Sequence, residues 1–271
     1  MWAARWLLLL LPFAAAAQSS FKQGEFLRIE ENGATAELNG KTVRIFRQAN
    51  GSFLGLMPAA VLEKPGTYPL TIKGAAGKVL RVEQITITDA HYPRQNIAAT
   101  KAMKELTPLP GEMEAVRALQ NTVSDKRFWA EPFIVPTGQC MNSRFGVTRY
   151  HNGKPTGAYH RGLDLRSPMG TPVRATAAGV VRIAKMYRLH GGTIGIDHGQ
   201  GVTSLYIHMS KLAATEGTEV RQGDVVGYTG ATGFATGPHL HWQVSVNGVP
   251  VNPDEWLGDA APEACRVATA H

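Results

Sequence analysis

Two short stretches of this sequence carry residue types that can hold a metal ion. Residues 159–165 read Tyr-His-Arg-Gly-Leu-Asp-Leu, and residues 237–242 read Gly-Pro-His-Leu-His-Trp. Together they offer three imidazoles and one carboxylate, which belong to His160, His239, His241 and Asp164. Histidine and carboxylate are ligands of zinc centres that keep one coordination position open for chemistry. We therefore expect the two stretches to meet in space.

The spacing of these residues constrains the elements that carry them. Residues two apart in a strand point to the same face, so His239 and His241 would stand side by side, about 6 to 7 Å apart at Cα. A helix would bring His160 and Asp164 together directly, but Gly162 between them is a poor helix former. A straight strand would hold the two about 13 Å apart, too far to share one ion. We expect His160 to end a loop, the chain to turn at Gly162 and Asp164 to begin a strand.

Four segments together resemble a known enzyme family. They are, in chain order, His160-Arg-Gly-Leu-Asp164, Ile196-Asp-His-Gly199, Tyr206-Ile-His208-Met-Ser210 and residues 229–241, which read Thr-Gly-Ala-Thr-Gly-Phe-Ala-Thr-Gly-Pro-His-Leu-His. Their order and approximate spacing are similar to those of the lysostaphin-type, or LytM-type, zinc metallopeptidases, which cut peptide bonds in bacterial peptidoglycan. The similarity runs from about Ser143 to about Pro253.

This resemblance implies a role for five residues. It makes His160, Asp164 and His241 the zinc ligands and places His208 and His239, as catalytic residues, beside the metal-bound water. Peptide hydrolysis needs a group that moves a proton from water to the leaving amine. The His-Glu-x-x-His motif, which supplies a glutamate for this step in other zinc peptidases, does not occur in the sequence. We expect the two spare imidazoles to take this step or to stabilise the tetrahedral intermediate.

The other histidines receive no metal role. Hydrogen-bonded surface or core positions are expected for four of them, His91, His151, His190 and His271. For His198 we expect a hydrogen bond that fixes a turn, and for Asp197 a turn or capping role.

The amino terminus has the pattern of a secretory signal. Arg5 precedes an apolar run over residues 6–13 and a small-residue stretch that ends at Ala17. An uncleaved signal anchor is the alternative, and Gln18 at the expected cut does not support a lipid anchor. No later stretch reaches about eighteen apolar residues. We expect export to the periplasm, cell envelope or extracellular space, without stable membrane insertion after cleavage.

The two cysteines and the net charge fit an exported chain. Cys140 and Cys265 predict a disulfide in an oxidising compartment, and two buried free thiols are the alternative. The formal charge of +7 favours anionic surroundings such as the cell wall. Nucleic acid is not expected as a partner, because the basic residues are scattered and no binding motif accompanies them. We expect a monomer.

The alternation of apolar residues predicts a mainly β chain with two β domains joined by a helical linker. The amino-terminal β-sandwich-like domain resembles, around Leu54–Pro58 and Lys64–Pro69, the immunoglobulin-like domain that precedes the zinc domain in some exported relatives. The carboxy-terminal domain is expected to be an antiparallel, β-rich zinc peptidase domain, in which the polar residues 150–158 form a flexible wall of the cleft. The expected boundaries are 1–17 for the signal peptide, 18–95 for the immunoglobulin-like domain, 96–127 for the linker, 128–258 for the zinc domain and 259–271 for the tail.

These observations lead to one function and two alternatives. The sequence predicts a zinc endopeptidase that hydrolyses cross-links or stem peptides of peptidoglycan, with peptidoglycan peptides as its partner. The first alternative is a non-catalytic, wall-binding regulator of another peptidoglycan hydrolase. The second is a general secreted protease with the same site. The sequence does not identify the bond that is cleaved.

Overall fold

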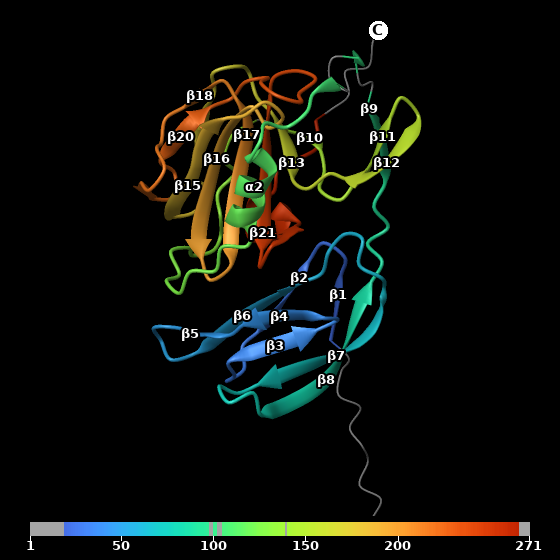
Figure 1. Ribbon diagram of the computed structural model, residues 1–271, viewed down its shortest axis with the longest axis vertical. Helices are drawn as coiled ribbons and strands as arrows, with labels where there is room; N and C mark the ends of the chain where they lie inside the picture. Colours follow the sequence, from blue (N-terminus) through green and yellow to red (C-terminus); the bar gives the residue numbers. More distant parts are fainter. Residues whose placement is uncertain (1–18, 98–99, 102–104, 139, 266–271) are drawn as a thin grey trace, which may run out of the picture.

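The structure is a computed structural model that describes residues 19–97, 100, 101, 105–138 and 140–265. The expected signal segment and His271 lie outside the described residues. The chain is mainly β, as the sequence predicts, with an amino-terminal group of sheets below a larger antiparallel domain (Figure 1).

The amino-terminal strands form two sheets, a five-stranded one with the order β1-β8-β7-β3-β4 and a three-stranded one with the order β2-β6-β5. Their bounds are β1 Ser20–Lys22, β2 Phe26–Ile29, β3 Thr35–Leu38, β4 Lys41–Arg44, β5 Phe46–Arg47, β6 Phe53–Pro58, β7 Gly66–Lys73 and β8 Val79–Thr88. Alternating side chains such as Leu70 and Ile72 fill the core between the sheets. An immunoglobulin-like identity for this region, and its boundaries, stay predictions.

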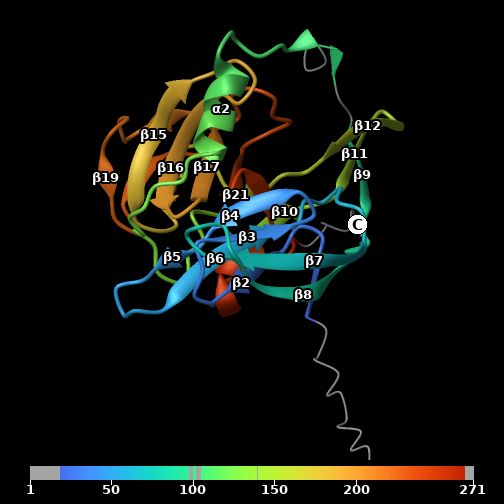
Figure 2. The ribbon, with the colours of Figure 1, turned by 60° about the horizontal axis from the view of Figure 1, so that its bottom comes forward.

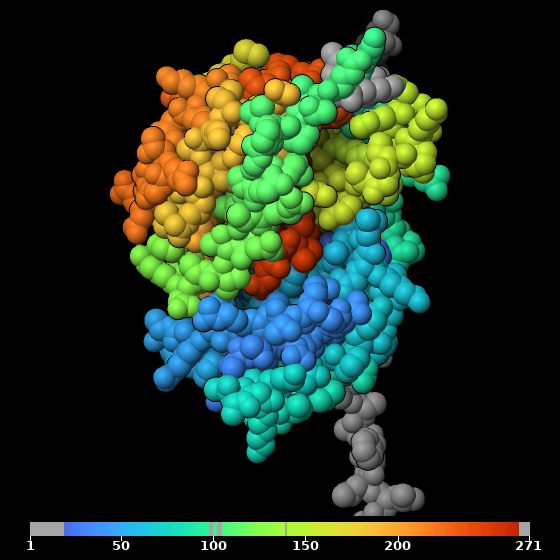
Figure 3. Space-filling view, viewed as in Figure 1, coloured from blue at the N-terminus to red at the C-terminus, as the bar shows by residue number. Residues whose placement is uncertain are grey.

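Strand β6 lies between the two halves of the molecule. Leu54 and Leu56 pack into the carboxy-terminal core, whereas Met57 packs into the amino-terminal core. The ring of Phe26 also stacks on that of Trp256, with 4.9 Å between centroids. The two halves therefore share apolar contacts along a broad boundary, which Figure 3 shows in space-filling form.

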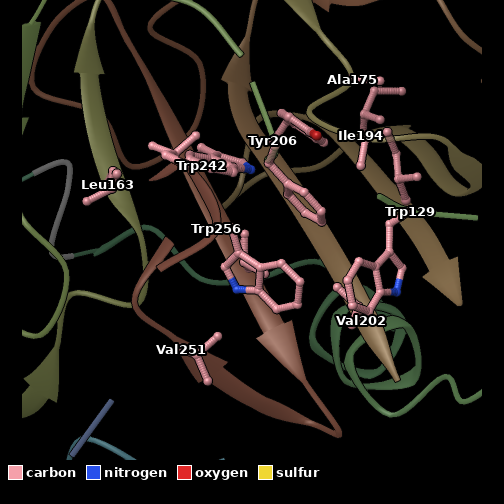
Figure 4. Close-up of a cluster of buried hydrophobic side chains, with 14 of the residues drawn as sticks. Trp129, Leu163, Ala175, Ile194, Val202, Tyr206, Trp242, Val251 and Trp256 are labelled. Atoms are coloured by element: carbon pink, nitrogen blue, oxygen red, sulfur yellow. The ribbon is translucent and has the colours of Figure 1, made fainter. Parts of the chain in front are cut away.

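The carboxy-terminal domain is built on an eight-stranded antiparallel sheet with the order β10-β13-β21-β17-β16-β15-β19, in which β22 pairs with β21. The bounds are β10 Cys140–Ser143, β13 Leu163–Arg166, β15 Gly179–Met186, β16 Gly192–Gly199, β17 Val202–Met209, β19 Glu219–Val220, β21 His239–Val246 and β22 Val249–Val251. A second sheet contains β14 Pro172–Arg174, β20 Val225–Tyr228 and β18 Lys211–Leu212. Strands β16 and β17 are buried along their whole length. Large rings such as Trp129, Tyr206, Trp242 and Trp256 fill the core (Figure 4).

Helix α2, Glu112–Gln120, covers part of this sheet. Val116 and Leu119 pack against Ile183, Leu205 and Ile207 of β15 and β17. The sequence predicts this amphipathic helix as a connection between domains. In the structure it is a packed layer of the carboxy-terminal domain, and its apolar face ends before the half-exposed Val123.

The polar residues 150–158, expected as a flexible loop, instead form most of a β-hairpin. Strands β11 Thr148–His151 and β12 Lys154–Tyr159 pair across a turn at Asn152 and Gly153, where φ is 51° and 80°. Two consecutive left-handed residues make the tight turn that Asn-Gly favours. Strand β9, Arg94–Ile97, adds in parallel to β11, so that the three strands lie beside the main sheet (Figure 2).

The predicted disulfide is confirmed. Cys140, the first residue of β10, is bonded to Cys265, with 4.9 Å between the Cα atoms. Beside the bond, the backbone N–H of Cys265 donates to the carbonyl of Met141 at 2.9 Å. The carboxy-terminal segment is thereby held against the outer strand of the sheet.

Candidate metal centre

The register of two strands brings Asp164 and His241 together. Asp164 lies on β13 and His241 on β21, and the two are directly opposed Cα partners. His160 precedes β13, where the chain turns at Gly162. A Cβ atom at that position would lie 2.2 Å from the carbonyl oxygen of Trp242, so only glycine permits this close approach. The loop, turn and strand expected from the sequence are all present.

Three donor atoms converge at this point. His160 Nε2 lies 2.8 Å from Asp164 Oδ1 and 2.9 Å from His241 Nδ1, and His241 Nδ1 lies 2.9 Å from Asp164 Oδ1. All three atoms can therefore reach a single ion at the about 2.0 to 2.2 Å typical of zinc. No other group of three or more histidine, cysteine or acidic residues among the described residues has ligand atoms placed closely enough to hold a metal ion.

The hydrogen bonds behind the cluster fix what its atoms can do. His160 Nδ1 lies 2.7 Å from the carbonyl oxygen of Arg144, which can only accept, so Nδ1 carries the proton. The Nε2 atom of a neutral His160 then presents a lone pair toward two further acceptors, His241 Nδ1 and a carboxylate oxygen. Such an arrangement of acceptors fits a bound cation, and a ligand imidazole at a metal site usually donates its other ring N–H to a carbonyl or carboxylate oxygen.

The charges at the cluster also fit a cation. Burial alone would raise the pKa of Asp164, but its close contacts with the imidazoles of His160 and His241 hold that pKa well below its usual range. Burial lowers the pKa of His241 to about 4. At neutral pH the centre therefore offers an ionised carboxylate and an unprotonated His241, the forms that bind metal.

His208 of β17 and His239 of β21 lie beside the centre. His208 Nδ1 donates to the carbonyl oxygen of Thr232 at 2.9 Å, and His239 Nδ1 donates to that of Gly237 at 2.8 Å. Each ring thus presents its Nε2 lone pair, and His239 Nε2 lies 3.8 Å from Asp164 Oδ1. Burial, followed by the nearby imidazoles, lowers the pKa of His208 to about 3. The two ring centroids are 4.9 Å apart.

A cavity of about 650 Å³ surrounds the five residues. Its walls come from β9, the β11–β12 hairpin, the turn after β15 and the segment before β21. The rings of His151 and Phe234 stack from two of these walls, with centroids 5.7 Å apart. None of the strands β1 to β8 contributes a residue to this lining. The amino-terminal sheets therefore form no part of the cavity wall within the described chain.

The structure brings together all five residues that the sequence selects for this site. It also places in the cavity wall two histidines, His151 and His190, for which only surface or core roles are expected. His198 lies in the core, where it bonds to the carbonyl of Ala178 and to Ser204. Asp197 accepts from the backbone N–H of Gly199 at 2.9 Å, which matches its expected turn role.

Two polar residues of the site are missed by the sequence reasoning. Arg149 of β11 contacts Asp164 Oδ2, and Gln95 of β9 accepts from Arg149. No local pattern singles out either residue, because each reaches the site through the long-range pairing of β9 with β11.

The antiparallel sheet of the carboxy-terminal domain thus carries a His-Asp-His cluster that could hold a metal ion, with two further imidazoles beside it. Residues 158–253, which contain all five site residues, match the sequence profile of Peptidase family M23. This match covers the carboxy-terminal sheet from β13 onward, but neither β10 nor the amino-terminal sheets.

Curated proteins are similar in sequence to part of this chain. The DD-carboxypeptidase/endopeptidase Mpg of Neisseria meningitidis is 44% identical over 113 residues, which are 42% of this chain and 26% of that protein. The peptidoglycan DD-endopeptidase ShyA of Vibrio cholerae is 38% identical over 112 residues, 41% of this chain and 26% of that protein. The chain thus aligns with about a quarter of the length of each.

A solved structure extends the likeness to most of the chain. A crystal structure from Pseudomonas aeruginosa assigned to peptidase M23 superposes with a TM-score of 0.63 at 28% identity, over 87% of this chain and 94% of that one. The likeness to the Pseudomonas aeruginosa structure therefore includes the amino-terminal sheets as well as the carboxy-terminal domain. Among the described residues, no helix has the length and apolar character needed to cross a membrane.

Proposed function

We propose that the protein is an exported zinc endopeptidase that hydrolyses D,D-peptide cross-links of peptidoglycan. The single observation that carries the proposal is the convergence of His160 Nε2, Asp164 Oδ1 and His241 Nδ1 on one point beside two further imidazoles. The names of the relatives Mpg and ShyA support the substrate class and the bond type. The disulfide and the basic charge support action outside the cytoplasm.

Each residue of the centre has a place in the reaction. His160, Asp164 and His241 would hold the zinc ion. When bound, zinc supplies Lewis-acid activation of water and of a substrate carbonyl. His208 and His239 each present an Nε2 lone pair beside that position, so either ring can accept a proton from water at Nε2. The Nε2–H formed in this way can then hydrogen-bond to the developing negative charge and pass the same proton to the leaving amine.

The cavity suits an extended peptide. Apolar side chains such as Ile97, Leu189 and Phe234 line it beside the polar centre. Such a surface can hold the short aliphatic side chains of a stem peptide while its scissile amide reaches the ligands.

A regulator without catalysis is disfavoured by the complete donor set. A wall-binding protein that only activates another hydrolase has no need of two proton-accepting imidazoles beside three converging ligand atoms. The zinc content of the purified protein distinguishes the two functions, because only the enzyme requires one tightly bound ion per chain.

Digestion of purified peptidoglycan tests the proposal. The protein should release muropeptides whose masses correspond to cleaved D,D cross-links, and His241→Ala should release none and retain no zinc. Full activity of His241→Ala would refute the assignment of the centre. Release of glycine-bridge or unrelated protein fragments alone would refute the substrate class.

A further inference from the structure

Glu112, the first residue of helix α2, is an acidic residue with no exposed surface. Its Oε1 accepts hydrogen bonds from the backbone N–H of Leu189 at 3.0 Å, the backbone N–H of His190 at 2.8 Å and the Nδ1–H of His190 at 2.7 Å. Its Oε2 accepts from the backbone N–H groups of Leu109 at 2.7 Å and Arg188 at 3.3 Å. A buried carboxylate is costly unless it is bonded in this way. Glu112 therefore ties the helix to one turn of the main sheet.

That turn, residues 187–191, forms part of the cavity wall behind the metal centre. Leu189 and His190 line the cavity. The carbonyl oxygen of His190 accepts from the backbone N–H of His208 at 2.9 Å, and the carbonyl oxygen of Leu189 accepts from that of Phe234 at 2.8 Å. One turn thus supports both a spare imidazole and the segment before β21.

The backbone of His208 needs such support. Its φ is 67°, a left-handed conformation that costs free energy in a residue with a Cβ atom. Strain of this kind persists only where the surroundings hold it in place. The backbone N–H of His208 is held by His190, and its ring is held by the carbonyl of Thr232. Thr232 in turn accepts, through Oγ1, from the backbone N–H of Gly192 next to the turn.

We propose that Glu112 is a positioning residue for the reaction. Its carboxylate fixes the turn 187–191, and the turn fixes the backbone of His208 and the segment that orients the His208 ring. The inference rests on the proposed function, since His208 matters to the rate only if the centre hydrolyses peptides. It concerns a residue outside the segment that matches the peptidase family.

The charge of Glu112 is part of this role. Burial would raise its pKa, but the hydrogen bonds from Leu109 and His190 and the charge of His190 keep that pKa below its usual range. In Glu112→Gln, one carboxylate oxygen is replaced by an amide NH₂ group. Backbone N–H groups face both oxygens of Glu112, so the NH₂ group would meet a donor where the wild type has an acceptor. The turn then loses at least one of its anchoring hydrogen bonds while the volume of the side chain is kept.

The test compares Glu112→Gln with Glu114→Gln in the full-length protein. Glu114 lies in the same helical turn but is exposed, and its carboxylate forms an ion pair with Arg117 at 3.1 Å. Three quantities are measured: zinc per chain, kcat and KM on a cross-linked muropeptide, and the hydrogen-exchange rate of the His208 amide. For Glu112→Gln we expect wild-type zinc content, a kcat lowered about 10- to 100-fold with a smaller change in KM, and faster exchange of that amide. Glu114→Gln should match the wild type in all three.

Wild-type kcat and wild-type exchange in Glu112→Gln would overturn the inference. If that variant does not fold, Glu112→Asp, which keeps the charge but withdraws it by one methylene, should show the same split between kcat and zinc content. Loss of zinc or of the fold in both variants would show that Glu112 only stabilises the domain, which also overturns the inference. If the wild-type protein cleaves no peptidoglycan, the proposed function fails, while the exchange of the His208 amide still decides whether Glu112 positions it.

Discussion

The guanidinium of Arg149 lies 3.4 Å from Asp164 Oδ2, whereas Asp164 Oδ1 is the oxygen shared by the two ligand imidazoles. The carboxylate thus divides its oxygens between the metal position and a cation behind it. Both side chains are largely buried, with 13% and 16% of their surface exposed. Gln95 of β9 accepts from the other Nη atom of Arg149, so the strand that follows the amino-terminal sheets helps to hold the metal ligand.

Replacement of Arg149 should weaken metal binding. Arg149→Met keeps much of the volume but leaves Asp164 Oδ2 without its cation, so the carboxylate is less well oriented. We expect zinc affinity to fall about 10- to 100-fold, the usual cost of losing a partner behind a metal ligand. Competition with a chromophoric chelator measures the change. The control is Arg161→Met, at an exposed position between His160 and strand β13. Equal zinc affinities of the Arg149→Met and Arg161→Met variants would contradict the prediction.

The two spare imidazoles should affect the rate without affecting the metal. His208→Ala and His239→Ala leave the three converging donor atoms in place, so each variant should keep one zinc per chain. Each should lose about 10²- to 10⁴-fold in kcat, the range of a general acid or base. The control is His151→Ala, whose ring lines the cavity but contacts Phe234 and not the centre. Zinc loss in His208→Ala or His239→Ala would show that the ring is a ligand after all.

Part of the site could be predicted from local periodicity, whereas the ligand roles of His160, Asp164 and His241 are implied by the resemblance of four segments to a known enzyme family. Side chains two residues apart in a strand point to the same face, which places His239 and His241 side by side without knowledge of the fold. Gly162 disfavours a helix, and a straight strand would keep His160 and Asp164 too far apart to share one ion, which leaves a turn at Gly162. The direct pairing of Asp164 with His241 is set by the register of the neighbouring antiparallel strands β13 and β21, which the sequence does not predict.

The rest depends on contacts that no local pattern records. Glu112 begins an amphipathic helix, where an acidic residue is expected to be exposed, yet it is buried against a turn far along the chain. The hairpin β11–β12 was predictable in part, since Asn152-Gly153 is a strong turn signal, but its charged and polar strands lack apolar alternation. They become strands because they pair with each other and because β9 pairs with β11.

The disulfide should stabilise the fold without supporting the chemistry. Cys140 and Cys265 are 125 residues apart, so their bond restricts the unfolded chain by up to about 5 kcal/mol in the chain-entropy model. The double variant Cys140→Ser, Cys265→Ser should have a lower urea midpoint, which reports the smaller free energy of unfolding. It should still bind zinc, because neither sulfur touches the centre. Wild-type protein with the bond reduced is the matched control. An unchanged urea midpoint would show that the bond adds no net stability.

His198 should make the stability depend on pH in a defined window. Burial lowers its pKa to about 4, against an ordinary value of 6.5, and its ring contacts Phe133, Ser204 and the carbonyl of Ala178. As the pH falls below 6.5, the unfolded chain binds a proton at this position and the folded chain does not, so the free energy of unfolding decreases until about pH 4. The effect of this one group is about 3 kcal/mol, present in full above pH 6.5 and lost below pH 4.

His198→Gln should remove this component. The variant is expected to be less stable than the wild type at neutral pH, and the difference in unfolding free energy between the two should shrink as the pH falls from 6.5 to 4. Urea unfolding at constant zinc across that range measures it, and the buried His208 and His241 contribute equally to both proteins. His91→Gln, at an exposed position, should follow the wild-type pH dependence. A constant difference between His198→Gln and wild type at every pH would mean that His198 takes up its proton as readily in the folded chain as in the unfolded one.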